Sequence, residues 1–329
     1  MQLRRGGFPE NVVFVIRAYR RRPAPPCEKI AALLPSSATL LAWYFVAIWG
    51  SGFLATKVGL HYAAPFTFLA LRYAFGLICL APVLLWMRPA WPRSPREIFH
   101  ILVAGLLMHA VQLGGSHYAQ YLGLSAGVTA LTMAAQPLLT ATIAWRWMGE
   151  RLSRRQWTGV LVGLAGVALV IWHKIDVHVL TAGGLAAVAT GLTGVTAGTL
   201  YQRAFCRHVN LWSGAFLQFA ISFAVLAPLA LRFEGARIDW SWQLAASIAF
   251  LVIFASIFAV NALHTLMRRG QATRVTSLMY LTPIIAVVLE FLMFGERPSA
   301  LTMAGVAVTC FGVALVSAPR RSNAVLRKA

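Results

Sequence analysis

A carboxylate lies inside one of the most apolar stretches of the chain. Residues 283–299 read PIIAVVLEFLMFGERPS, with Glu290 in the middle. An ionisable side chain costs roughly 2.5–3.5 kcal/mol at the centre of a membrane helix, so it must face protein or water. A carboxylate there can exchange a proton with solvent or contact an amine. Glu290 is therefore our candidate for ion coupling. The alternatives are a buried partner for Arg72 and a polar patch between subunits.

Other polar side chains also fall within apolar segments, where they can bind a small polar molecule. Arg72 can pair with a carboxylate, and His109, Gln112 and Ser116 repeat at spacings of three and four, which predicts one helical face. A mainly apolar pocket with a few polar groups suits amino acids and amphiphilic metabolites. For each residue taken alone, a hydrogen bond between helices is the alternative. The pocket candidates are Trp49, Ser51, Arg72, His109, Gln112, Gln136, Tyr201, Asn261 and His264.

Two prolines and two Gly-Glu-Arg triplets punctuate the apolar segments. Pro137 and Pro283 each remove a backbone donor, which predicts either a fixed kink or a moving hinge. Residues 149–151 and 295–297 both read Gly-Glu-Arg and fall at predicted helix ends. Glycine there permits a left-handed residue that ends the helix. We interpret the triplets as linkers, with a transport gate as the alternative.

The composition indicates that these residues are carried on membrane helices. Of 329 residues, 59% are hydrophobic and 12% are charged, whereas a soluble domain has about 25% charged residues. A helix needs roughly 20 apolar residues to cross a bilayer. The sequence therefore predicts an all-α membrane protein with ten transmembrane helices. The ten segments are 38–60, 64–86, 98–118, 124–147, 156–172, 180–201, 211–231, 241–264, 274–294 and 299–318.

The net charge of +20 is distributed by loop. With ten spans, 23 Lys and Arg residues fall on one side and five on the other. This asymmetry predicts that both termini are cytoplasmic. The basic tails, 1–37 and 319–329, are therefore expected to meet anionic lipid, and no nucleic-acid partner is expected.

The chain repeats itself with an offset of 146 residues. Thirteen of the 34 positions in 137–170 are identical to those in 283–316, including Pro, Gly-Glu-Arg and a final GVALV. The same offset pairs Lys57 with Arg203 and Arg72 with Gln218. Each half has five predicted spans, and an odd number means that the second half enters the membrane from the opposite side. We therefore predict two inverted five-helix repeats, 38–172 and 180–318, with a substrate between them.

The residues at these positions resemble a known family. The resemblance rests on Trp49-Gly50-Ser51 with Lys57 following, on Ala70-Leu71-Arg72-Tyr73, on Tyr118-Ala119-Gln120-Tyr121, and on the paired Pro and Gly-Glu-Arg elements. Together these resemble the drug/metabolite transporter superfamily, specifically its EamA-like family. The resemblance implies two EamA modules of five helices each, a bacterial inner-membrane location and export of amino acids or other small metabolites.

We therefore expect a secondary active transporter that moves a small molecule by alternating access, with proton exchange as its driving reaction. The sequence carries no nucleotide-binding loop, metal-ligand spacing or catalytic triad, so we expect no cofactor and no enzymatic activity. The alternatives are a receptor or assembly subunit that transports nothing, and an intramembrane enzyme using His109, His264 or Glu290. The sequence leaves the oligomeric state open.

Overall fold

The computed structural model describes residues 37–147, 153–176, 181–259, 262, 266 and 281–317. Within these ranges the chain is helical apart from short connections and one isolated bridge between Ala63 and Ile238. This agrees with the predicted all-α class. The basic tails, the triplet at 149–151, Asn261 and His264 lie outside the described residues.

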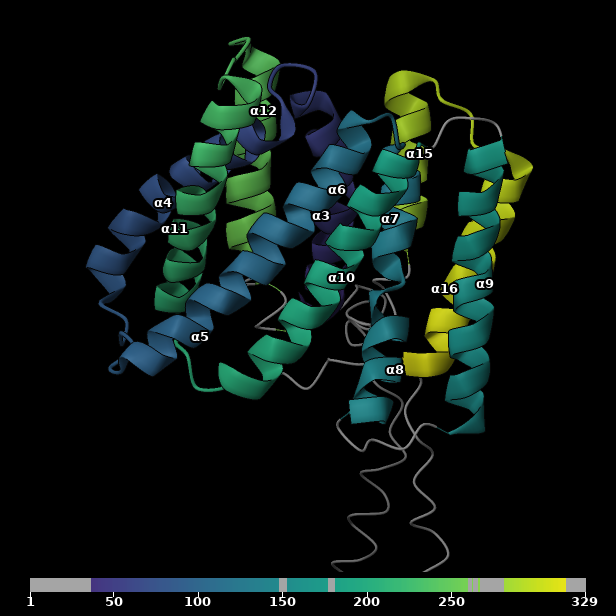
Figure 1. The fold of residues 1–329 in the computed structure, drawn as a ribbon, viewed down its shortest axis with the longest axis horizontal. Helices are drawn as coiled ribbons and strands as arrows, with labels where there is room; N and C mark the ends of the chain where they lie inside the picture. The colour runs from purple at the N-terminus through teal and green to yellow at the C-terminus, as the bar shows by residue number, and fades with distance from the viewer. Residues whose placement is uncertain are drawn as a thin grey trace, which may run out of the picture. The chain divides into compact units, whose positions relative to one another are not determined.

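The first half of the chain forms helices from α3 to α9 (Figure 1). Their bounds are Ser37–Gly59 (α3), Pro65–Met87 (α4), Pro95–Gly105 (α5), Leu106–Val111 (η1), Gln112–Tyr121 (α6), Ala126–Ala134 (α7), Gln136–Trp147 (α8) and Arg154–Asp176 (α9). The segment η1 is a π-helix that joins α5 to α6 without a loop.

The second half forms helices from α10 to α16. Their bounds are Ala182–Phe205 (α10), Leu211–Leu229 (α11), Ala230–Glu234 (η2), Trp242–Ala249 (α12), Phe250–Ala259 (η3), Thr282–Phe294 (α15) and Ala300–Ser317 (α16). Several helices in both halves begin at a side chain that accepts a hydrogen bond from a first-turn amide, which satisfies a donor that the helix leaves unpaired. These caps are Ser94, Ser125, Thr181, Asn210 and Ser241.

Helices of the two halves begin at matching positions. The offset of 146 residues carries the first residue of α4, Pro65, onto Leu211 of α11. It also carries Gln136 of α8 onto Thr282 of α15, and Arg154 of α9 onto Ala300 of α16. The sequence repeat is therefore also a repeat of secondary structure.

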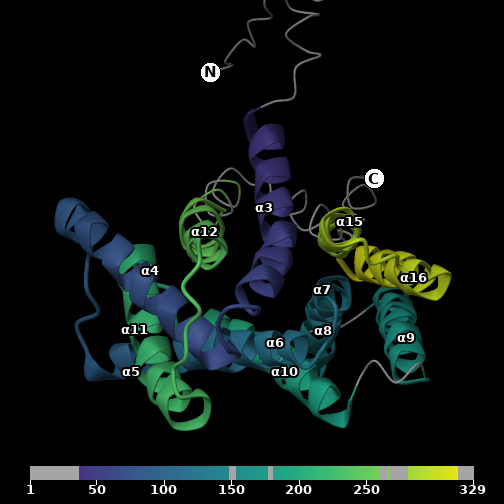
Figure 2. The same ribbon diagram turned by 90° about the horizontal axis from the view of Figure 1, so that it is seen from above.

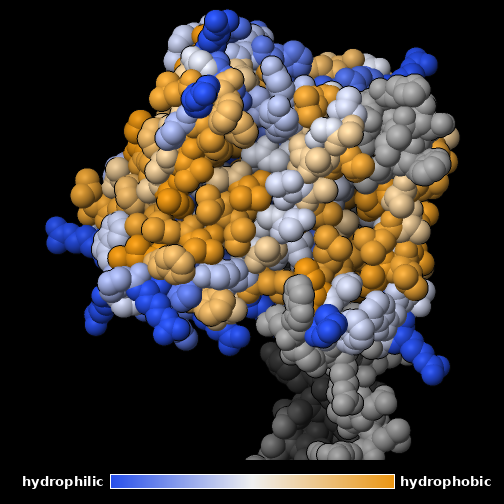
Figure 3. Space-filling view, viewed as in Figure 1, coloured by the Kyte–Doolittle hydropathy of each residue, from blue (hydrophilic) through white to orange (hydrophobic). Residues whose placement is uncertain are grey.

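In the described part of the chain, seven helices are long and apolar enough to cross a membrane, and α15 and α16 are shorter apolar helices. Large apolar side chains remain exposed along these helices, among them Leu85, Leu231 and Leu292 at 67–78% exposure. Figure 3 shows apolar side chains across the middle of the visible face, with hydrophilic side chains gathered above and below. A bilayer supplies the apolar surroundings that such a surface requires.

Helices of the two halves pack extensively against one another: α9 with α16, α6 with α10, α4 with α11, and α7 with α15. Figures 1 and 2 both show α9 and α16 side by side. Their backbones approach closely at Gly166 and Gly312, where an added Cβ would lie 2.5 Å from Thr309 Oγ1 and 2.7 Å from Gly159 O respectively. Small residues permit such packing between membrane helices. Gly166 and Gly312 are themselves related by the offset of 146.

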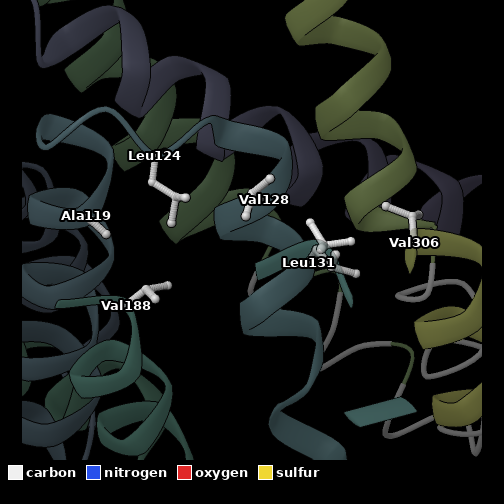
Figure 4. Packing of buried hydrophobic residues seen from close by; sticks show 7 residues of the cluster. Ala119, Leu124, Val128, Leu131, Val188 and Val306 are labelled. Atoms are coloured by element: carbon white, nitrogen blue, oxygen red, sulfur yellow. The ribbon is translucent and has the colours of Figure 1, made fainter. Parts of the chain in front are cut away.

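A buried apolar cluster holds α6, α7, α10 and α16 together (Figure 4). Leu131 of α7 and Val306 of α16 are nearly inaccessible, as is Val188 of α10. This cluster lies beside the start of α7, so it fixes the helix end on which the candidate site is built.

The two predicted hinge prolines occupy the first turns of helices. Pro137 is the second residue of α8, which follows the end of α7 at Ala134. Pro283 is the second residue of α15. Proline removes no helical hydrogen bond in a first turn. Pro137 therefore starts the second part of a broken span instead of kinking a continuous helix, and its action as a hinge stays a prediction.

Candidate functional site

Glu290 is buried although its neighbours on α15 are not. The residue is 4% exposed, whereas Phe291 and Leu292 are 42% and 69% exposed. Its Oε1 accepts a hydrogen bond from Lys57 Nζ at 2.7 Å and another from the Ala126 amide at 2.9 Å. Its Oε2 accepts from the Gly127 amide at 3.0 Å. Three donors thus replace the water that the carboxylate has lost.

The start of α7 is built to receive this carboxylate. Ser125 caps the helix by accepting from the Val128 amide, which leaves the Ala126 and Gly127 amides for Glu290. The first amides of a helix carry partial positive charge, so they stabilise an anion. Gly127 has no Cβ, and one placed there would lie 3.3 Å from Glu290 Oε2. The glycine therefore lets α15 approach the helix end.

Lys57 completes this arrangement from the last turn of α3. Its ammonium also donates to Glu296 at 2.5 Å and lies 4.7 Å from the centre of the Phe294 ring. We call the group formed by Lys57, Ala126, Gly127, Glu290 and Glu296 the Lys57–Glu290 junction. Its first three members belong to the first half of the chain and its carboxylates to the second. The junction therefore joins the halves.

The structure gives Glu290 a partner other than Arg72. The Arg72 guanidinium instead donates to Ser256 Oγ of η3 at 3.3 Å. His109 Nε2 lies 3.2 Å from Gln218 Oε1 of α11, and Gln218 Nε2 in turn lies 3.5 Å from Gln202 Oε1 of α10. Arg72 and His109 therefore each contact the second half, but at places separate from Glu290.

The remaining pocket candidates make local contacts or bridge neighbouring helices. Ser51 Oγ donates to the Ala47 carbonyl at 2.7 Å, and Trp49 is 38% exposed beside Phe45. Gln136 Nε2 donates to Thr199 Oγ1 at 2.9 Å, and Tyr201 Oη lies 2.7 Å from His100 Nδ1. The contacts of Gln136 and Tyr201 join neighbouring helices, whereas those of Ser51 and Trp49 lie within α3.

The predicted common face of His109, Gln112 and Ser116 is interrupted. His109 lies in the π-helical segment η1, where the spacing of an α-helix does not apply. Gln112 begins α6, and its carbonyl lies against Gly191 of α10. Ser116 Oγ donates to the Leu113 carbonyl. The sequence pattern assumed one continuous α-helix, so it could not anticipate this change.

A cavity of about 610 Å³ opens where α10 ends. It is lined by Met108, Thr199, Gln202, Arg203, Cys206 and Arg207. At the other end of α10, an added Cβ at Gly183 would contact Leu122, which precedes the start of α7 by four residues. The 24 residues of α10 span about 36 Å at the usual helical rise. The cavity and the Lys57–Glu290 junction therefore lie toward opposite ends of this helix.

Sequence reasoning missed Lys57 as the partner of Glu290, and it missed Arg203 and Arg207 as cavity residues. The repeat contained a signal for two of them, because the offset of 146 pairs Lys57 with Arg203. Both are basic residues in the last turns of equivalent helices, α3 and α10. Among the described residues no three His, Cys, Asp or Glu side chains are grouped as a metal site requires.

Comparison with solved structures gives a likeness of fold. One crystal structure, titled only as that of a protein, matches with a TM-score of 0.62 at 20% identity. The match covers 86% of this chain and 96% of the other. At this identity the likeness concerns the fold alone.

Curated relatives align along most of their length. The chain is 27% identical over 296 residues to the "Uncharacterized inner membrane transporter YedA" of Escherichia coli K12, covering 87% of this chain and 91% of the relative. It is 26% identical to the "Uncharacterized transporter YvbV" of Bacillus subtilis 168, covering 88% and 95%. It is 25% identical to an Escherichia coli K12 protein named "Probable amino-acid metabolite efflux pump", covering 83% and 92%.

The model of the EamA-like transporter family matches twice, at residues 36–172 and 181–318. The matches together cover most of the chain and separate the same two halves as the offset of 146. The resemblance noted in the sequence is therefore confirmed, and with it a membrane transporter and not an enzyme. The chain belongs to the EamA-like transporter family.

Proposed function

We propose that this transporter exports small organic metabolites, such as amino acids, by alternating access between two inverted five-helix repeats, 38–172 and 180–318. The tandem family match and the equivalent helix starts support the two-repeat organisation. A relative named as an amino-acid metabolite efflux pump supports the substrate class and the direction. Repeats of this kind hold the substrate between them and exchange conformations.

The observation that carries this proposal is the contrast between the two ends of α10. Toward one end, Lys57 ties α3 of the first half to α15 of the second through Glu290. At the other end, residues of both halves line the open cavity. Such an arrangement suits a carrier that is closed on one side and accessible on the other. Opening the closed side requires Lys57 and Glu290 to separate.

Glu290 remains our candidate for proton coupling. Protonation would remove the charge that attracts Lys57 and would weaken the junction. In this proposal, a proton taken up from the outside accompanies opening toward that side. Glu290→Gln is expected to abolish flux driven by a pH gradient while the protein stays folded. An unchanged pH dependence in this variant would exclude Glu290 from coupling.

We place the transporter in a bacterial inner membrane with both termini in the cytoplasm, from the loop charges and from relatives named for that membrane. The cavity end of α10 then faces the cytoplasm, as an exporter requires for substrate uptake. Reporter tags at the two termini and between α9 and α10 test this topology. Tags showing that the two repeats enter the membrane from the same side would contradict the inverted arrangement.

Two measurements test the transport function. Spent medium from cells that overproduce the chain is compared by metabolomics with medium from cells that overproduce Glu290→Ala. A metabolite enriched only with the unaltered chain is then loaded into liposomes with purified protein. We expect flux that depends on the protein and on an ion gradient. Absence of flux for any enriched metabolite under every gradient would refute the proposal.

A further inference from the structure

Among the described residues, the charged side chains that line the cavity at the end of α10 are basic. They are Arg203 and Arg207. Arg207 Nε donates to the Arg203 carbonyl at 2.8 Å, which fixes this guanidinium beside the end of the helix. Gln202 and Thr199 add an amide and a hydroxyl, while Met108 supplies an apolar wall from the first half.

We propose that this cavity binds small carboxylate-bearing metabolites, with Arg207 and Gln202 as the residues that recognise the carboxylate. The proposal rests on the proposed function only for the role of the cavity as a substrate entrance. Binding itself can be measured without transport.

A carboxylate matches this lining in both charge and shape. A guanidinium presents a planar set of donors that fits two carboxylate oxygens. Hydrogen bonds between ionised partners are about twice as strong as neutral ones. A volume of about 610 Å³ falls within the ordinary range for small-molecule sites. The positive charge of Arg207 also repels amines, so the cavity selects against cationic compounds.

Uncharged polar groups continue from the cavity into the protein. Gln202 lies on the cavity, its Oε1 is 3.5 Å from Gln218 Nε2, and Gln218 Oε1 is 3.2 Å from His109. Helices of both halves contribute to this series. On the path that we propose, a ligand leaving Arg207 would next meet the amides of Gln202 and Gln218, which bind a carboxylate less strongly than a guanidinium does. A site on a transport path must release what it binds.

Cys206 provides a direct probe because its thiol lines the cavity. We would replace Cys27, Cys79 and Cys310 by Ser in the full chain and follow modification of Cys206 by anionic and cationic methanethiosulfonates of similar size. The proposal expects the anionic reagent to react about tenfold faster, because the arginines concentrate anions. In Arg207→Gln this preference is expected to fall severalfold, and Arg207→Lys should retain most of it.

Arg96→Gln is the matched control. Arg96 is an exposed arginine at the start of α5, predicted on the same membrane side and absent from the cavity lining. Its replacement removes the same charge but should leave the reagent preference unchanged. An equal loss in Arg96→Gln and Arg207→Gln would show a general surface effect and would overturn the proposal.

Three compounds with one four-carbon skeleton then define the ligand class. Succinate is expected to protect Cys206 from modification, whereas succinamide and 1,4-diaminobutane are not. Protection by succinate should weaken about tenfold in Arg207→Gln, as expected for loss of a charge-assisted hydrogen bond. Equal protection by all three compounds, or none by succinate, would refute carboxylate recognition. Because the assay needs no flux, it can succeed where the transport proposal fails, and the reverse also holds.

Discussion

Lys57 and Arg203 occupy equivalent positions in the two halves, yet their surroundings differ. Each lies in the last turn of a long helix, α3 or α10. Lys57 sits between the carboxylates of Glu290 and Glu296, whereas Arg203 lines a cavity beside Arg207. The repeat therefore places a basic residue at each site, while the residues around it differ between the halves.

Glu290 accounts for much of this difference. Its counterpart in the first half is Ala144, so the second basic site has no carboxylate at the matching position. A buried ion pair is by itself weak evidence for stability, because both groups lose hydration. At the Lys57–Glu290 junction, two backbone amides also satisfy the carboxylate. The junction is therefore expected to stabilise one closed arrangement of the halves more than its ion pair alone could.

Removing Glu290 is expected to have the largest effect on the difference between the Lys57 and Arg203 sites. In Glu290→Ala, the Ala126 and Gly127 amides and the Lys57 ammonium lose a shared acceptor inside the protein. We expect a loss of about 3–5 kcal/mol in stability, as for a buried pair deprived of one member, and a loss of transport. Thermal unfolding of the purified protein and flux in liposomes measure these effects.

Glu296→Gln serves as the control for that substitution. The Glu296 side chain also contacts Lys57, but it is 51% exposed. Exposed pairs contribute about 0–1 kcal/mol, so this variant should unfold close to the original temperature. Equal destabilisation by the two substitutions would mean that total charge around Lys57, and not the burial of Glu290, determines the strength of the junction.

The contact between α9 and α16 differs from the Lys57 and Arg203 sites, because here the two halves contribute equivalent residues. Gly166 and Gly312 are equivalent residues, and each packs against the opposite helix with no room for a side chain. Gly166→Val and Gly312→Val should each cost about 1–3 kcal/mol, as overpacking does, and the two costs should be similar. Thermal unfolding checks this. Strongly unequal costs would show that the halves differ in this contact as well.

The sequence predicted the helical class, because that depends on patterns along the chain. The duplication at an offset of 146 agrees with the structure, in which α8 and α15, and likewise α9 and α16, begin at equivalent residues. Local apolar runs and shared Pro and Gly residues were sufficient for this. Neither pattern depends on which helices contact one another.

The sequence did not predict the neighbours of the polar residues. Glu290 was recognised as unusual, but Lys57, its partner, is 233 residues away. The π-helical segment η1 changed the neighbours of His109 without any proline or glycine inside it to indicate the change. Contacts of this kind depend on packing between distant segments, which periodicity along a single chain does not encode.

Gly127 allows a smaller and more selective change at the Lys57–Glu290 junction. A Cβ there would press on Val287 of α15 and lie 3.3 Å from Glu290 Oε2. Gly127→Ala should therefore separate α7 from α15 and cost about 1–2 kcal/mol. Gly183→Ala is the matched control, since its Cβ would meet Leu122 at an ordinary 3.5 Å. The temperature of thermal unfolding should fall only in Gly127→Ala. Equal behaviour of both would mean that α15 can move aside without loss.

At the cavity, the smallest expected effect concerns the Cys206 thiol. Partial burial raises the pKa of this thiol, because the loss of hydration disfavours the thiolate. Only the thiolate reacts rapidly with maleimides, so alkylation near neutral pH should be severalfold slower than for a free cysteine. The rate should rise as pH passes above the ordinary cysteine value of about 8.5. The dependence of the rate on pH is measured by quenching the alkylation at set times and quantifying the product by mass spectrometry. A profile midpoint below that of free cysteine would instead mean that the charges of Arg203 and Arg207 outweigh burial at this thiol.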